Sequence, residues 1–78
     1  MKTTRYFDEI RKRPDRAAIR EEWIAQVADA PEHERTQADG QIRRWARIGE
    51  ASGRWLRVVV LADGETVHNA FFDRGFRP

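Results

Sequence analysis

The segment from Arg54 to Phe72, RWLRVVVLADGETVHNAFF, constrains the fold more than any other part of this sequence. Its first half is rich in β-branched residues and predicts a central strand. Asp63-Gly64 is the clearest short hairpin signal in the chain, and ETVHNAFF predicts the return strand. A chain of 78 residues has room for one compact core, so we expect a single domain over residues 1–78.

The residues before this hairpin predict two further strands. HERTQ, residues 33–37, is typical of a short edge strand, and ADGQ predicts a turn with Gly40 in the strained position. QIRRWARI, residues 41–48, has strict alternation. One side of this strand would carry Ile42, Arg44, Ala46 and Ile48, and the other Arg43, Trp45 and Arg47.

The N-terminal part predicts two helices. In TTRYFDEIRKR an N-cap at Thr3 or Thr4 precedes an apolar stripe, and Pro14 ends the helix. Asp15 then caps a second helix, RAAIREEWIAQVADA, which Pro31 closes. Both helices are too short to be stable alone. We therefore predict an α+β fold in which two N-terminal helices pack on one face of a four-stranded antiparallel meander sheet.

Composition excludes several classes of function. The chain has no cysteine, its two histidines lack the spacing of metal ligands, and no glycine-rich nucleotide motif is present, so we expect neither metal nor cofactor. Its single serine, Ser52, does not stand in a hydrolase triad pattern. No apolar run approaches 18 residues and the N-terminus is too charged for a secretory signal, so we expect a cytoplasmic protein without a membrane partner.

Charge is unevenly distributed along the chain. Residues 1–20 carry a net +4, residues 21–40 carry −5, residues 41–61 carry +4 and residues 62–78 carry −1. The two basic blocks are able to form a patch that attracts phosphate, whereas the acidic block would repel it or meet a basic partner. A surface of internal salt bridges without any partner explains the same pattern.

Counting outward from a two-residue turn at Asp63-Gly64 gives a register for the hairpin. Val60 then pairs with Val67 and Val59 with His68, which makes His68 a diagonal neighbour of Arg57 on the face away from the helices. If Arg43, Trp45 and Arg47 join that face, guanidinium groups and flat rings form a platform for single-stranded RNA. Polar residues on the water side of a sheet are also ordinary structural features.

The chain resembles the RelE/ParE-like toxin superfamily of type II toxin–antitoxin modules, nearest the BrnT-like branch and related small domains of unknown function. The residues that carry this resemblance are IRKRPDRAAIREEWIAQVADAP, ADGQIRRW and GRWLRVVVLADGETVHNAFF, from about Ile10 to Phe72. The resemblance implies a metal-independent mRNA endonuclease that a cognate antitoxin protein neutralises. By strand position alone, it suggests roles for Arg57 and His68.

Two hypotheses follow from these observations. In the first, the protein is an endoribonuclease: His68 moves a proton near neutral pH, Arg57 stabilises the phosphorane charge, and Asp73 orients a base or pairs with Arg74. RNA would be held by Arg43, Arg44, Trp45, Arg47 and Arg54. In the second, the same fold is a non-catalytic module that binds nucleic acid or protein through the acidic stretch Glu21–Asp39 and the rings of the open sheet face.

Overall fold

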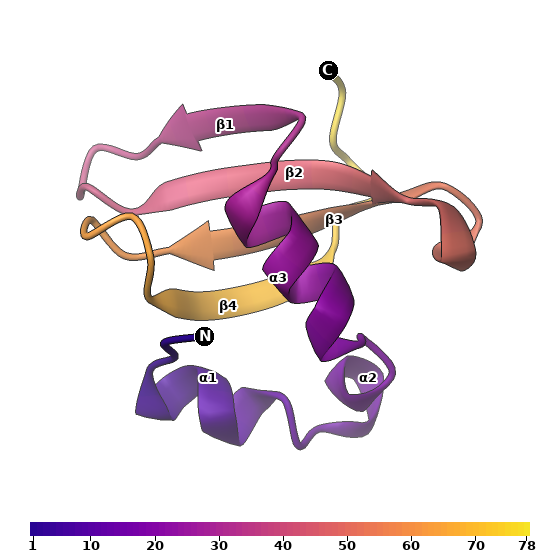
Figure 1. Ribbon diagram of the computed structural model, residues 1–78, viewed down its shortest axis with the longest axis horizontal. Coiled ribbons are helices and arrows are strands. Elements are labelled where there is room, and N and C mark those ends of the chain that lie inside the picture. The colour runs from indigo at the N-terminus through magenta and orange to yellow at the C-terminus, as the bar shows by residue number, and fades with distance from the viewer.

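The computed structural model describes residues 1–78 and has two layers, helices on one face of a sheet (Figure 1). The helices are α1 (Arg5–Ile10), α2 (Pro14–Ala17) and α3 (Glu21–Asp29). The strands are β1 (His33–Thr36), β2 (Ile42–Ile48), β3 (Arg54–Val60) and β4 (Val67–Phe72), and a 3₁₀ turn, η1 (Gly49–Ala51), joins β2 to β3. All strand pairs are antiparallel in the order β1-β2-β3-β4, which confirms the predicted meander.

The second predicted helix is two helices in the structure. Arg20 has extended backbone torsions and separates α2 from α3. This break lets α3 cross the face of the sheet while α1 and α2 lie along its β4 side (Figure 1). Both Ile19, next to the break, and Ile24 in α3 reach the core because the chain changes direction between them.

The core lies between α3, α1 and one face of the sheet. Alternate residues of the strands are fully buried there, since successive side chains of a strand point to opposite faces. The cluster contains Phe7, Ile19, Ile24, Val27, Ala46, Ile48, Ala51, Leu56, Val58, Val60, Val67 and Ala70. None of the three helices has the length and apolar character that crossing a lipid bilayer requires.

The predicted register of the β3–β4 hairpin is correct near the turn and wrong beyond it. Val60 pairs with Val67 as predicted, but Val59 pairs with Asn69 rather than His68. A β-bulge at His68 shifts the rest of β4 by one residue, and a shift of one residue exchanges the two faces of a strand. Ala70 and Phe72 therefore pack on the core side, where Phe71 was expected.

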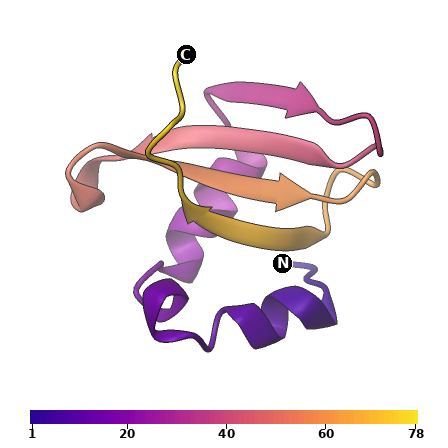
Figure 2. The same ribbon diagram turned by 180° about the vertical axis from the view of Figure 1, so that it is seen from behind.

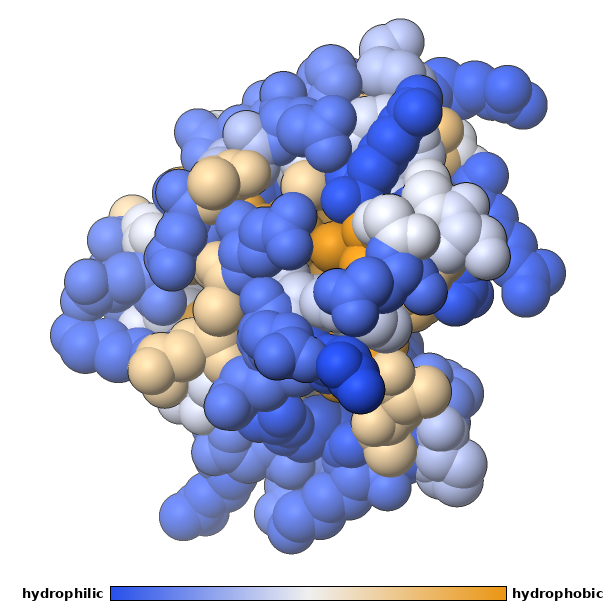
Figure 3. All heavy atoms as spheres, turned by 45° about the vertical axis from the view of Figure 1, so that its right-hand side comes forward, coloured by the Kyte–Doolittle hydropathy of each residue, from blue (hydrophilic) through white to orange (hydrophobic).

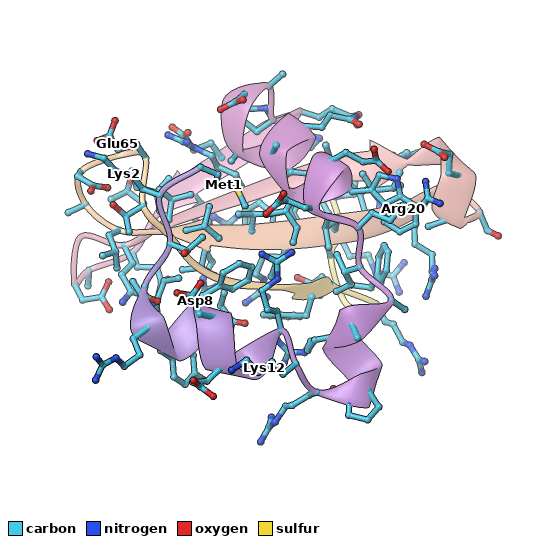
Figure 4. All side chains as sticks on the ribbon, turned by 60° about the horizontal axis from the view of Figure 1, so that its bottom comes forward. Met1, Lys2, Asp8, Lys12, Arg20 and Glu65 are labelled. Carbon is cyan, nitrogen blue, oxygen red and sulfur yellow. The ribbon has the colours of Figure 1, made fainter.

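The N-terminal segment pairs with β4 directly beside the bulge. The main chain of Val67 accepts a hydrogen bond from Thr4 N and donates one to Lys2 O, which forms a parallel bridge beside β4. The ion pair between Lys2 and Glu65 lies next to this bridge (Figure 4). The start of β4 thus pairs with two backbone segments, β3 on one side and the N-terminal segment on the other. The regular β3–β4 ladder is interrupted at the next residue, His68.

The turn of this hairpin also differs from the predicted two-residue turn. Gly64 N donates to Leu61 O, so the chain reverses over Leu61–Gly64, and Gly64 has a φ of +77°. The carboxylate of Asp63 accepts hydrogen bonds from the backbone N–H groups of Glu65 and Thr66 and from the Thr66 hydroxyl. These hydrogen bonds lower the pKa of Asp63 to about 2, and the bond from the Thr66 hydroxyl has the largest effect.

Candidate nucleic-acid interface

The face of the sheet opposite the helices carries most of the predicted binding residues. Arg43, Trp45 and Arg47 of β2 project there, as predicted, and Trp55 and Arg57 of β3 lie beside them in the ladder. Residues of β1 at the matching positions are His33 and Arg35, since His33 pairs with Trp45 and Arg35 with Arg43. We call this surface the open face.

Residues after β4 cover the middle of the open face. The C-terminal segment rises from the end of β4 past the other strands on the side away from the helices (Figure 2). The ring of Phe76 stacks on Trp45 with centroids 4.4 Å apart and planes at 18°. Phe76 also meets Trp55 at 4.9 Å and His33 at 5.4 Å. Trp45 is only 3% exposed as a result, so it is not the open stacking platform that the sequence predicted.

Arg57 and Asp73, two of the three predicted catalytic residues, form an ion pair. The Nη2 of Arg57 donates to Oδ2 of Asp73 at 2.7 Å, and Nε donates to the same oxygen at 3.0 Å. Trp45 Nε1 donates to that oxygen as well, at 3.0 Å. Burial raises the pKa of Asp73, but the hydrogen bonds from Trp45 and Arg57 and the Arg57 charge outweigh it, so the pKa lies below its ordinary value.

His68, the third predicted catalytic residue, has a different set of partners. Its Nδ1 hydrogen-bonds the Thr4 hydroxyl at 2.9 Å, and its ring lies 4.9 Å from that of Tyr6. Thr4 is the N-cap of α1, so the side chain of His68 contacts the helical layer. The guanidinium of Arg57 lies instead on the open face, near the rings of Trp45 and Phe71. The structure therefore brings Arg57 and Asp73 together and does not bring His68 to them.

A hollow of about 390 Å³ lies on the open face beside the Arg57–Asp73 pair. Four guanidinium groups line it, together with the rings of Trp45 and Phe76, and Asp73 is its only carboxylate. Arg35, Arg43 and Arg77 of this set form no ion pair, and the Nε of Arg43 is buried without a hydrogen-bond partner. The four guanidinium groups are Arg35, Arg43, Arg57 and Arg77, which with Asp73 leave a net charge of +3 on the hollow.

This concentration of charge has an electrostatic cost in the free protein. Arg35 and Arg43 are direct cross-strand partners, and like charges opposite each other destabilise a sheet. A carboxylate at either position would instead have given an ion pair. The arrangement suits an anion with several oxygens, because guanidinium groups bind phosphate through paired hydrogen bonds.

The remaining predicted RNA-binding residues lie in three environments. Arg47 is on the open face, with its guanidinium 4.9 Å from the centre of the Trp55 ring. Arg54, at the start of β3, lies over Phe72 at 4.0 Å and donates to Ala51 O. Arg44 projects to the helical layer, where it pairs with Glu34 and donates to Ala28 O and Gly64 O, so it is a structural arginine.

Three of the six acids in the stretch Glu21–Asp39 form ion pairs within the chain. Glu21 pairs with Arg11, Glu22 with Arg20 and Glu34 with Arg44. Figure 3 shows one side of the molecule covered mainly by hydrophilic side chains, with strongly hydrophobic colour confined to a small area between them. The side that Figure 3 shows therefore has no broad apolar surface, and arginines neutralise half of the acids in the stretch.

Sequence reasoning missed Arg35, Phe76 and Arg77. Arg35 could have been found, because its place in HERTQ opposite Arg43 follows from pairing the first two strands across the Gly40 turn. Nothing in the pattern of GFRP indicates that Phe76 returns to the sheet. The side chains contain no cluster of three histidine, cysteine or acidic residues able to hold a metal ion. Comparison of the chain with protein-family models, curated proteins and solved structures finds no match.

Proposed function

We propose that this protein binds single-stranded RNA through the open face of the sheet, as a non-catalytic module. The observation that carries the proposal is the hollow lined by Arg35, Arg43, Arg57 and Arg77 with one neutralising carboxylate. RNA supplies the phosphates that such a site needs, and the exposed ring of His33 and the partly exposed rings of Trp55 and Phe76 are available to unpaired bases. An acidic protein would satisfy the charges but would leave the rings without a matching partner.

Endonucleolytic cleavage by a type II toxin, neutralised by a cognate antitoxin, remains a prediction from the family resemblance. It requires a group near the phosphate that accepts the 2′-hydroxyl proton. The carboxylate of Asp73 is the only such group lining the hollow, and its lowered pKa and the four hydrogen bonds that it accepts make it a poor base. Binding without cleavage is therefore the function that the geometry supports better.

Fluorescence anisotropy of a labelled 12-nucleotide RNA tests the proposal. We expect Arg43→Ala to weaken binding by about tenfold and to reduce the slope of log K against log salt by about 0.7, as expected for one lost contact to a single-stranded phosphate. Arg5→Ala is the matched control, because Arg5 is an exposed α1 arginine without an ion pair. It should leave the affinity and the slope nearly unchanged.

Three further samples separate the alternatives. A DNA strand of the same sequence tests the contribution of the 2′-hydroxyl, a duplex tests the need for unpaired bases, and polyglutamate represents an acidic protein. Equal binding of RNA and polyglutamate would contradict the proposal. Incubation of the unlabelled RNA with protein and EDTA, followed by a gel, tests cleavage: fragments that depend on Arg57 would favour the endonuclease over the binding module.

A further inference from the structure

The aromatic slot that holds Phe76 has the form of a base-binding site. Trp45 is its floor, and Trp55 and His33 are its walls. The near-parallel stacking of Phe76 on Trp45 is the geometry that an unpaired base adopts on an aromatic side chain. The slot and the arginine hollow adjoin, because Trp45 and Phe76 belong to both.

The segment that fills this slot is weakly attached. Asp73 N donates to Trp55 O, which is the last backbone hydrogen bond between the chain and the sheet. Beyond it, Gly75 N donates to the Asp73 carboxylate and Phe76 N to Asp73 O, so these bonds hold the segment only to itself. The ring of Phe76 is thus the main contact of residues 74–78 with the open face.

We propose that the slot is a nucleobase site and that Phe76 occupies it in place of a base until RNA binds. The inference rests on the proposed function, since a phosphate in the hollow beside Arg43 would deliver the neighbouring base to the slot. The Asp73 ion pair with Arg57 stays in place, and only the segment after it moves. Arg77 leaves the hollow with this segment, so the phosphate is bound by Arg35, Arg43 and Arg57, which belong to the strands. Phe76 then lowers the apparent affinity by keeping part of the protein in a closed form.

The sign of one mutation separates this role from a permanent one. If Phe76 occupies the slot only until a base replaces it, Phe76→Ala tightens binding of the 12-nucleotide RNA. The expected gain is about tenfold, because the base then stacks on Trp45 without first displacing the Phe76 ring. If Phe76 is itself a lasting part of the RNA-binding surface, the same change weakens binding, which would overturn the inference. Phe76→Leu keeps an apolar cover with less stacking and should fall between wild type and Phe76→Ala.

An abasic oligonucleotide of equal length and charge is the control ligand. Wild type and Phe76→Ala should bind it equally, because no base is present to enter the slot. If Phe76→Ala binds both the RNA and the abasic oligonucleotide more tightly than wild type, the change has made the whole open face more accessible. That result would contradict a site specific for a base. Circular dichroism checks that each variant is folded, and the Leu variant carries the test if the Ala variant unfolds.

Failure of this inference is distinguishable from failure of the proposed function. RNA binding that depends on Arg43 but does not tighten in Phe76→Ala overturns the base site and leaves the proposed function intact. Binding by Phe76→Ala without measurable binding by wild type supports both. Absence of RNA binding in wild type and in both Phe76 variants overturns both.

Discussion

The hydroxyl of Thr4 serves two neighbours. It accepts a hydrogen bond from Phe7 N, which caps α1, and it bonds to Nδ1 of His68 in β4. One side chain thus ties the first helix to the last strand. His68, which the sequence suggested as a proton-transfer group, has a structural partner, and the residue that supplies this partner lies 64 positions away.

We expect Thr4→Ala to lower the free energy of unfolding by about 1–2 kcal/mol, because the helix loses its N-cap and His68 loses its partner. Urea denaturation measures the change. Thr4→Ser keeps a hydroxyl at the same place and is the matched control. Equal stability of the Ala and Ser variants would show that the hydroxyl contributes nothing.

Asp73→Asn removes the charge that neutralises Arg57. Both side chains are mostly buried, at 22% and 12% exposure, so we expect a loss of about 1.5–3 kcal/mol at pH 7. The pKa of Asp73 is lowered in the folded state, so its contribution is present above the unfolded pKa, near 4, and is lost as pH falls through the lower folded pKa.

Urea denaturation at pH values from 7 to 2 tests this expectation. Wild type should lose more stability than Asp73→Asn between pH 4 and 2. Asp29→Asn is the control, because Asp29 is exposed and has no ion pair. If the free energy of unfolding falls equally for wild type and Asp73→Asn as the pH is lowered, the Arg57–Asp73 pair does not have the stabilising role assigned to it.

At the scale of elements, the turn before β4 depends on one glycine. Gly64 has a φ of +77°, and a Cβ there would meet nothing closer than an Arg44 nitrogen at 3.9 Å. Gly64→Ala should therefore cost about 1 kcal/mol through backbone strain alone. Gly49→Ala is the matched control: its backbone is not in the left-handed region, its Cβ would have open space, and thermal melting should show no loss.

The sequence predicted those elements whose signals are local. Thr4 caps the first helix, Gly40 has a φ of +91° in the first hairpin, and alternation in β2 places Trp45 and its neighbours on the open face. The bulge at His68 was missed because it lies where the N-terminal segment bonds to Val67. The helix break at Arg20 was missed because the helical periodicity continues through it.

At the scale of the whole molecule, the two faces of the sheet differ in how charge is neutralised. Acids pair with arginines on the helical side, whereas the open face keeps Arg35 and Arg43 opposed and unpaired. A protein selected for stability alone would not place like charges there. Of the residues that line the hollow, sequence reasoning named Arg43, Trp45, Arg57 and Asp73. The face of the first three follows from strand alternation, whereas Asp73 lies after the end of β4.

Arg35→Thr should reveal this conflict between stability and binding. We expect the variant to be more stable by up to about 0.5 kcal/mol at low salt, because the repulsion of Arg43 is removed, with the gain disappearing at 1 M salt. The same variant should bind RNA more weakly. Thermal melting at the two salt concentrations measures the first effect and anisotropy the second. A variant less stable than wild type at low salt would contradict the assigned repulsion.

The bridge between Lys2–Thr4 and Val67 also bears on the order of assembly. Every strand pairs with its neighbour in sequence, so the sheet is able to grow through successive local hairpins. Docking of the N-terminus must wait until Val67 is in place, since some 60 residues separate the two. We expect native-state hydrogen exchange to show amides of α1 opening at lower free energy than those of β2 and β3, because α1 docks on a sheet whose hairpins form without it.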